Sequence, residues 1–262
     1  MPGKPEFISA SQIGQYVFCP LSYRYLYIDG YKKSPHTPYT LYGTALHETL
    51  AHNYRQKIAS EIDLSASDLF QVYRGAMSDL IAKHDVRDTK GITQGMEINA
   101  EMTLQRYMAE VAPKIQPLLV EHKFELQLKN YPITILGYID LVTVEGWIID
   151  HKSAGKTWKR DWTQDKVDDS MQLTMYSAAY RKMFGKAEAG VRIDVLPRVI
   201  PAETLSIESY RTDGQVTKLL QMATDIDRLI DMGIWVPNLN SCSACPFKDI
   251  CPKQPILPPR QS

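Results

Sequence analysis

The amino-acid sequence predicts an α/β (α+β) fold, with a small mixed β-sheet flanked by helices. Short runs rich in β-branched and bulky apolar residues indicate strands, and longer segments with apolar residues at helical spacing indicate helices. Strands that have helices on both sides in the sequence are typical of a sheet covered by helices. The 262 residues are enough to bury a substantial core.

The helices are expected near residues 12–19, 43–60, 67–84, 96–112, 170–184 and 215–232. The first long helix is indicated by Leu46, Leu50 and Tyr54, which are spaced by four and share one face. Strands are expected at residues 121–129, in a hairpin within residues 137–152, and near residues 191–195 and 205–210. The strand at 121–129 is indicated by a regular alternation of charged or polar residues with apolar ones.

The charge balance excludes a global attraction for polyanions, because thirty basic residues match thirty acidic ones. Any binding of nucleic acid must therefore come from a local patch. The sequence shows no apolar run long enough to span a bilayer, and its first residues lack an apolar signal core. We expect a cytoplasmic protein with no membrane partner.

The most informative segment is the predicted hairpin, which contains Asp140, Asp150 and Lys152. The residues around them are mostly β-branched or bulky, as buried strands require. Charged groups seldom stay inside such strands without a partner or a metal. Two carboxylates and an amine on one hairpin could hold a divalent cation and ready a water for attack on a phosphodiester.

The length of the hairpin loop decides whether these groups share a face. A two-residue loop at 145–146 would turn the two aspartates to opposite sides of the sheet. A three-residue loop at 144–146, with its glycine in the left-handed conformation, pairs Asp140 with Asp150 and brings Lys152 to the same face. Opposite residues have Cβ atoms about 5 Å apart. Carboxylates that close repel unless a cation lies between them, so we expect this register together with a metal.

The four cysteines predict a second metal-binding site. Cys19 stands alone, and Cys242, Cys245 and Cys251 lie together in a polar segment with prolines. In a reducing compartment this spacing favours a metal clamp over disulfides. Four thiolates suit either Zn²⁺ or a 4Fe–4S cluster. Either would hold the two ends of the chain together.

Several other side chains are candidates for the site in the hairpin. His47 follows Gly43 by four residues, and the glycine would let the helix approach a strand closely. Glu121 begins its strand and could add a carboxylate, although its neighbours in the alternation are solvated. Gln172 and Tyr176 share one helix face and could orient a phosphate, a base or the lysine.

A nucleic-acid contact is expected after the hairpin. Trp158 and Trp162, taken as exposed, lie among Lys159 and Arg160 and could form a stacking platform with a basic funnel for a single strand. A solvated loop with one buried tryptophan is the alternative.

Together these residues resemble the PD-(D/E)XK nuclease superfamily, in particular its RecB-like branch with an iron–sulfur cluster, which includes AddB-type recombination nucleases and CRISPR-associated RecB-like exonucleases. The resemblance reaches from Ser9 to Cys251. It rests on five motifs in order, namely Gly43-x-x-x-His47, Gly137-x-x-Asp140, Asp150-x-Lys152, Gln172-x-x-x-Tyr176, and Cys19 with Cys242-x2-Cys245-x5-Cys251.

The resemblance implies a restriction-endonuclease-like core and roles for individual residues. His47, Asp140 and Asp150 would bind Mg²⁺ or Mn²⁺, with the backbone carbonyl of His151 as a further ligand. Lys152 would position or deprotonate the attacking water. The resemblance also implies a 4Fe–4S cluster on the cysteines, with Zn²⁺ as the alternative occupant.

The implied organisation is one nuclease domain over residues 1–262. It comprises an N-terminal segment at 1–40, a helical insertion at 60–113, a catalytic core at 121–210, a cysteine-rich segment at 236–252 and an extended or disordered tail at 253–262.

The expected function is a metal-dependent DNA nuclease, an exonuclease acting on single strands or DNA ends. The alternatives are a zinc-bound structural module, and a non-catalytic DNA-binding scaffold of a helicase or integrase complex that retains the fold and the cluster. The intact set of Asp140, Asp150 and Lys152 argues against lost activity. Since the sequence has no Gly-x4-Gly-Lys loop for ATP, unwinding would require a helicase or another DNA-processing partner.

Overall fold

The computed structural model describes residues 3–31, 36–84, 86, 92–128 and 133–251. It divides into two compact units, which are described separately. The smaller unit contains residues 1–35, 124–137 and 212–262, and the larger unit contains residues 36–123 and 138–211. The predicted tail at 253–262 lies outside the described residues. Among the described residues, no helix is both long and apolar enough to cross a membrane.

The strands form a mixed sheet in the order β1-β3-β4-β5-β6, with β2 paired to β3. β1 pairs with β3 and β4 with β5 in parallel, whereas β3–β4 and β5–β6 are antiparallel. This architecture confirms the predicted fold class. The strands span Phe7–Ile8 (β1), Pro117–Gln127 (β2), Thr134–Thr143 (β3), Trp147–Ala154 (β4), Gly190–Pro197 (β5) and Leu205–Ser209 (β6).

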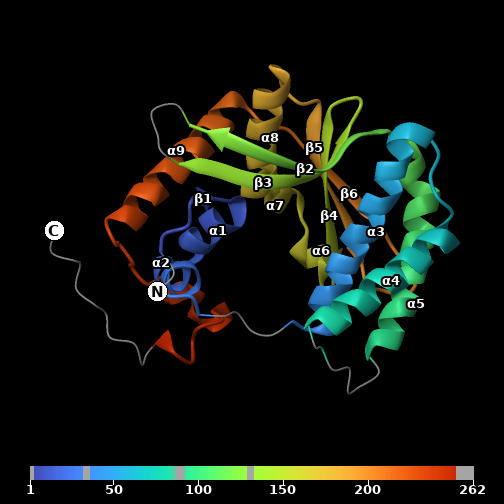
Figure 1. Ribbon diagram of the computed structural model, residues 1–262, viewed down its shortest axis with the longest axis horizontal. Helices are drawn as coiled ribbons and strands as arrows, with labels where there is room; N and C mark the ends of the chain where they lie inside the picture. Colours follow the sequence, from blue (N-terminus) through green and yellow to red (C-terminus); the bar gives the residue numbers. More distant parts are fainter. Residues whose placement is uncertain (1–2, 32–35, 85, 87–91, 129–132, 252–262) are drawn as a thin grey trace. The chain divides into compact units, whose positions relative to one another are not determined.

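Three long helices of the larger unit pack on one another beside β4, as Figure 1 shows. They are α3 (Pro38–Ser60), α4 (Ala66–His84) and α5 (Ile92–Glu110), and the 3-10 turn η2 (Ala112–Lys114) follows. α3 begins before Gly43, the predicted start. The reason is a capping box between Thr37 and Thr40 with Pro38 in the first turn, which the sequence prediction overlooked.

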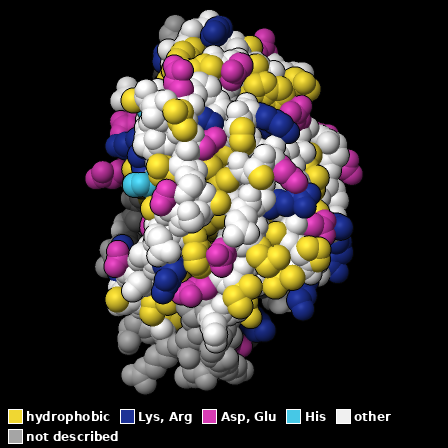
Figure 2. All heavy atoms as spheres, turned by 90° about the vertical axis from the view of Figure 1, so that its right-hand side faces the viewer, with side chains coloured by type: hydrophobic (Ala, Val, Ile, Leu, Met, Phe, Trp, Pro, Cys, Tyr) yellow, Lys and Arg dark blue, Asp and Glu magenta, His cyan; other side chains and the backbone are white. Residues whose placement is uncertain are grey.

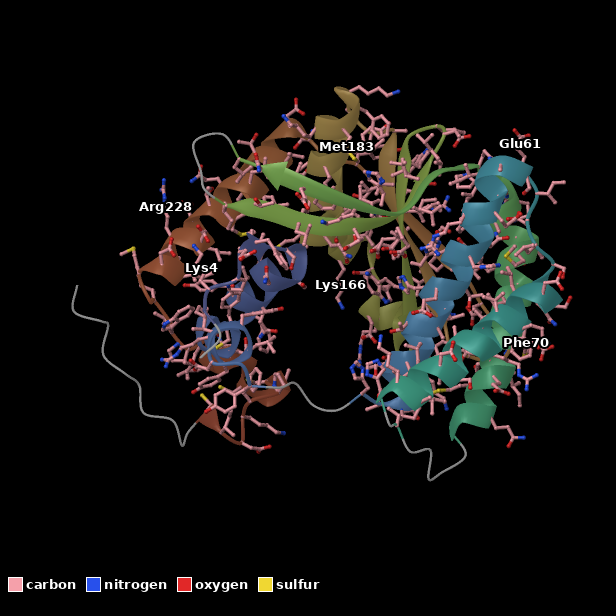
Figure 3. The ribbon with its side chains drawn as sticks, viewed as in Figure 1. Lys4, Glu61, Phe70, Lys166, Met183 and Arg228 are labelled. Atoms are coloured by element: carbon pink, nitrogen blue, oxygen red, sulfur yellow. The ribbon has the colours of Figure 1, made fainter. Side chains whose placement is uncertain are left out.

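The core of the larger unit lies between these helices and one face of the sheet. Leu46, Tyr73 and Leu104 are buried there from the three helices, and Ile149 is buried from β4. Phe70 on α4 packs at the edge of this core, and Glu61 ends α3 in a left-handed conformation (Figure 3). In Figure 2, side chains of both charge signs are interspersed on the face that is turned to the viewer.

The polar segment after β4 contains two short helices, α6 (Trp158–Asp161) and α7 (Gln164–Asp168). Helix α8 (Met171–Phe184) follows, close to its predicted bounds. Its cap is the side chain of Ser170, and it ends at Gly185 in the left-handed conformation.

The smaller unit brings together segments from both ends of the chain. Its helical elements are α1 (Ala10–Phe18), α2 (Pro20–Tyr23), the π-helical turn η1 (Arg24–Ile28), α9 (Asp213–Asp231) and the 3-10 turn η3 (Leu239–Ala244). Ser241 donates a hydrogen bond to the carbonyl of Phe18 at 2.8 Å, and Lys4 forms an ion pair with Asp227 at 2.5 Å. Tyr25 and Phe247 meet edge to face in a small apolar cluster that includes Cys19.

Candidate active site

The hairpin of β3 and β4 has the predicted three-residue loop and register. Gly146 has a φ of +91°, and its N–H donates to the carbonyl of Thr143 at 2.9 Å. An added Cβ at Gly146 would also lie 2.8 Å from the hydroxyl of Tyr180. The pairs that fix the register are Leu141 with Ile149 and Val142 with Ile148. Continuing the same offset places Asp140 opposite Asp150, as the sequence analysis expected.

His47, Glu121 and Asp140 form a group in which one potential ligand atom from each residue lies within 4.8 Å of the others. His47 Nδ1 lies 3.2 Å from Asp140 Oδ2. All three side chains are half-buried. An imidazole and two carboxylates at this spacing can contact one cation.

Glu121 reaches this group through an unusual backbone conformation. Its φ is +48°, the left-handed region that residues other than glycine seldom adopt. The alternation of side chains along β2 predicted that Glu121 lies on the solvated face. The left-handed conformation interrupts that alternation. Non-glycine residues held in this region are concentrated at functional sites.

Close packing of α3 against β4 places His47 beside the hairpin. A Cβ added to Gly43 would lie 2.7 Å from Ser153 Oγ, so helix and strand approach more closely than a side chain at residue 43 allows. This agrees with the role predicted for Gly43. His47 lies one helical turn further along α3.

A chain of polar contacts runs from Asp150 to α8. Lys152 Nζ lies 2.7 Å from Asp150 Oδ2 and donates to Gln172 Oε1 at 3.0 Å. Gln172 Nε2 in turn donates to the hydroxyl of Tyr176 at 2.6 Å. The structure therefore brings together Lys152, Gln172 and Tyr176. Burial and the nearby carboxylates raise the pKa of Tyr176, which keeps its hydroxyl protonated.

The two aspartates have opposite electrostatic behaviour. Burial, followed by the charge of Asp140, raises the pKa of Asp150 to about 6. Burial alone would raise the pKa of Asp140 as well, but the hydrogen bond and charge of His47 outweigh it and lower that pKa. Asp150 is only 1% exposed, and Oδ1 has no hydrogen-bond partner among the described residues. A carboxylate so buried is the kind of group that a cation would stabilise.

The pKa values of His47 and Glu121 reflect the same balance between burial and neighbouring charges. Burial would lower the pKa of His47, but its hydrogen bond to Asp140 raises it. Burial and the charge of Asp140 raise the pKa of Glu121. The carboxylate of Glu121 is therefore costly to ionise beside Asp140, and a divalent cation between the two would relieve that cost.

His151 faces the opposite side of β4 and is buried against the long helices. Its Nε2 lies 3.0 Å from the hydroxyl of Tyr107 on α5, which is also 2.9 Å from the hydroxyl of Tyr54. Tyr107 donates to Asp194 Oδ2 at 3.1 Å, and the backbone N–H of His151 donates to Asp140 Oδ2 at 3.1 Å. Burial lowers the pKa of His151 to about 4, so the ring is neutral at pH 7.

The hydrogen-bond pattern assigns the tautomer of His151. Tyr107 has one hydroxyl hydrogen and gives it to Asp194, so its oxygen accepts from His151 and Tyr54. Neutral His151 then carries its proton on Nε2. This cluster of Tyr54, Tyr107, His151 and Asp194 was not predicted from the sequence. Asp194, a charge within the apolar run of β5, gives the same signal that drew attention to Asp140 and Asp150.

The expected stacking platform requires a correction. Trp158 is only 6% exposed, because α6 turns its ring inward, and the expectation of an exposed ring there is wrong. Lys159 Nζ lies 4.9 Å from the centroid of that ring and 3.1 Å from a carboxylate oxygen of Glu203. Trp162 is half-buried, and Arg160 is exposed.

In the smaller unit, all four cysteines line one cavity of about 140 Å³. The N–H of Asn238 approaches Cys19 Sγ at 3.4 Å, and Cys245 Sγ lies 3.9 Å from the hydroxyl of Ser22. Among the described residues, no three of these sulfur atoms lie within 4.8 Å of one another. All four cysteines therefore border a common space, without three sulfur atoms at the spacing of a single-ion site.

Comparison with known families identifies the fold and its chemistry. The family model of the PD-(D/E)XK nuclease superfamily matches residues 8–252. The chain belongs to this superfamily. Membership implies hydrolysis of phosphodiesters with divalent metals, and the group of His47, Glu121 and Asp140 is a possible metal site. The observed sheet flanked by helices is consistent with the restriction-endonuclease-like core of PD-(D/E)XK proteins.

Two solved structures resemble this PD-(D/E)XK chain. The crystal structure of a "putative exonuclease" from Eubacterium rectale is 15% identical and has a TM-score of 0.59, with 98% of this chain and 91% of that chain covered. At this identity the likeness shows the fold alone. The crystal structure of SSO0001 is 13% identical and has a TM-score of 0.36, with 93% of this chain and 97% of that chain covered. None of the curated proteins matches the chain.

Proposed function

We propose that this PD-(D/E)XK protein is a Mg²⁺- or Mn²⁺-dependent deoxyribonuclease, an exonuclease that acts on single-stranded DNA or DNA ends. The observation on which the proposal rests is the hairpin register, which turns Asp140, Asp150 and Lys152 to one face of the sheet, with His47 and Glu121 beside Asp140. An oxygen-rich site with one imidazole suits Mg²⁺ or Mn²⁺. When bound, the cation would polarise the scissile phosphate and lower the pKa of its water.

The metal ligands would be His47, Asp140 and Asp150, with Glu121 and the backbone carbonyl of His151 as further ligands. Asp150 would also hold Lys152 through their ion pair at 2.7 Å. This contact leaves the ammonium group close to the carboxylates, where it can orient the attacking water and balance charge as the phosphorane forms.

Gln172 and Tyr176 would act through Lys152. The amide oxygen of Gln172 accepts from the ammonium, and its amide nitrogen is held by Tyr176. Because the Tyr176 hydroxyl remains protonated, this pair can restrain the lysine without exchanging protons with it. We assign the two residues a positioning role.

We further propose that the chain belongs to the RecB-like branch and binds a 4Fe–4S cluster on Cys19, Cys242, Cys245 and Cys251. The four thiols line one cavity, which supports a shared ligand. In a tetrahedral zinc site with Zn–S bonds of about 2.3 Å, the sulfur atoms would lie about 3.8 Å apart. Among the described residues no three of the sulfur atoms lie within 4.8 Å of one another, and the cavity that the cysteines line has room for the larger cluster. The cluster would hold segments of both chain ends together.

The test of the nuclease proposal is digestion of end-labelled single-stranded and double-stranded DNA, and of single-stranded RNA, with Mg²⁺ or Mn²⁺. We expect metal-dependent loss of DNA from the ends. Lys152→Ala should lower the rate at least a hundredfold, whereas Lys182→Ala, an exposed lysine of α8, should leave it unchanged. Equal rates for wild type and Lys152→Ala, or cleavage without a metal, would contradict the assignment. Preferential digestion of RNA would overturn the DNA part of it.

The cluster proposal has a separate test. We expect the protein, purified without oxygen, to be brown and to contain four iron and four sulfide ions per chain. Cys251→Ser should lose iron and become less stable. A colourless protein with one zinc ion per chain would show the alternative occupant.

A further inference from the structure

Residues along one side of α3 connect the candidate metal site to an exposed aromatic ring. Tyr39, Gly43 and His47 are spaced by four and lie on the same side of the helix. Gly43 meets Ser153 of β4, and His47 meets Asp140. At 1.5 Å per residue, Tyr39 lies about 12 Å along the helix axis from His47. The first turn of α3 therefore lies near the end of β4, past Lys152.

Arg198 lies at this end of the sheet. Its backbone N–H donates to the carbonyl of Ala154, the last residue of β4. Its guanidinium carbon lies 4.8 Å from the ring centroid of Tyr39 and 5.3 Å from that of Tyr42. Its Nη1 also donates to the backbone carbonyl of Tyr39 at 3.3 Å. Two rings and a carbonyl thus hold the guanidinium in place.

The charge of Arg198 is not neutralised within the described part of the chain, where no carboxylate forms an ion pair with it. Lys156, two residues beyond Ala154, is exposed and likewise has no carboxylate partner there. By contrast, Lys159 is paired with Glu203. The end of β4 therefore offers positive charge that is available to a phosphate.

Tyr39 provides the apolar part of the surface. It is 50% exposed, whereas Tyr42 one turn away on the helix is fully buried. A half-exposed ring fixed by a guanidinium can stack with a planar group. Bases within a duplex are covered by their neighbours, so only an unpaired base can use such a ring.

We propose that Tyr39 and Arg198 form a subsite for one unpaired nucleotide of a single strand, with the base on Tyr39 and a phosphate on Arg198. The proposal rests on the nuclease function proposed above and specifies its substrate as single-stranded near the site. A separation of about 12 Å corresponds to three or four nucleotides of a stacked strand, and to fewer in an extended one. The subsite therefore acts on the strand a few nucleotides from the bond that is cut.

The experiment measures equilibrium binding of a fluorescent single-stranded DNA without divalent metal, and cleavage of the same DNA with Mn²⁺. Tyr39→Ala should weaken binding and raise KM about tenfold, with kcat changed less than twofold, because stacking on one aromatic ring contributes a factor of that order. Tyr39→Phe should restore wild-type values. Binding of a blunt duplex should be equal for all three proteins.

The matched control is Tyr210→Ala. Tyr210 is 66% exposed, but it packs near Trp147 at the opposite end of the sheet from Arg198. This variant should bind the single strand as the wild type does. The backbone carbonyl that anchors Arg198 is unchanged in Tyr39→Ala, so the arginine keeps one of its contacts.

Two further measurements separate the base from the phosphate. Arg198→Gln should reduce the slope of log affinity against log salt by about 0.7, the value for one phosphate of a single strand, whereas Tyr39→Ala should leave the slope unchanged. Oligonucleotides with one abasic position, placed in turn along the strand, should bind the wild type less well at one position. The same series should bind Tyr39→Ala uniformly.

The outcomes distinguish this inference from the proposed function. If the wild type cleaves single strands and Tyr39→Ala matches it in affinity, KM and response to abasic positions, the subsite is refuted and the nuclease remains. If the wild type cleaves no nucleic acid with any divalent metal, the nuclease proposal fails. In that case the binding measurements still decide whether Tyr39 and Arg198 contact a single strand.

Discussion

Replacing Asp150 with asparagine should make the metal-free protein more stable while abolishing cleavage. Burial and the neighbouring charge of Asp140 raise the pKa of Asp150 from 3.8 to about 6. The folded protein therefore binds a proton more tightly than the unfolded chain does. The stability that this group contributes is complete below pH 3.8 and is lost as the pH rises through 6. Asparagine has a similar shape and cannot ionise, so it avoids this loss.

The magnitude follows from the two pKa values. The contribution of Asp150 to the free energy of unfolding changes by about 3 kcal/mol in total, since each unit of difference between the folded and unfolded pKa contributes 1.36 kcal/mol. About 2 kcal/mol of it falls between pH 4.5 and pH 7.5, because the unfolded carboxyl is already largely ionised at the lower value. The advantage of Asp150→Asn over wild type should therefore grow by about 2 kcal/mol across this interval.

The assay is equilibrium urea unfolding of both proteins at the two pH values, in buffer without divalent metal. The comparison uses how the difference in unfolding free energy between the two proteins changes with pH, so effects of the substitution on packing that do not depend on pH cancel. The titration of His151 also cancels, because it occurs in both proteins. Asp165→Asn, at an exposed position on α7, is the control and should show no such change. An advantage for Asp150→Asn that stays constant or shrinks with rising pH would refute the account of the site.

Three more outcomes are expected. Tyr107→Phe should lower the free energy of unfolding, measured with urea, by about 2–4 kcal/mol, because Tyr54 and His151 would each lose a buried hydrogen bond. The control is Tyr73→Phe, which should change this free energy little because the Tyr73 hydroxyl has no partner among the described residues. Gly146→Ala should cost about 1–3 kcal/mol in the same assay and lower the rate of cleavage, since alanine is strained at a φ of +91° and would crowd Tyr180. Mn²⁺ at a hundred times its Kd should stabilise the wild type by about 2.7 kcal/mol and should stabilise Asp150→Asn much less, as measured by the shift in Tm. An equal shift in both proteins would contradict the ligand role of Asp150.

The hairpin could be predicted from the sequence because its constraints are local. The glycine in the loop and the two-residue period of strands leave few registers, and only one of those considered gathers the charges. The helices were found for a similar reason, since their apolar spacing is regular. Even so, the start of α3 was missed because its cap, Thr37, precedes the apolar pattern.

Features that depend on tertiary packing could not be read in this way. Trp158 was expected to be exposed because its neighbours are polar, but a short helix turns its ring inward. The placement of Glu121 depends on a left-handed residue inside a strand, which a side-chain pattern does not report. The contact of Tyr107 with His151 joins residues 44 positions apart, and their sequence neighbours give no sign of it.

The hydroxyl of Tyr107 also determines how far this protein can be trimmed. α5 supplies this hydroxyl to His151 and Asp194, on the face of the sheet opposite to Asp150 and Lys152. The helices within residues 60–113 are therefore not a dispensable insertion. A shortened version without these helices would expose Tyr54, His151 and Asp194 together and would need three compatible replacements. Engineering a minimal form should therefore begin by redesigning those positions as apolar ones.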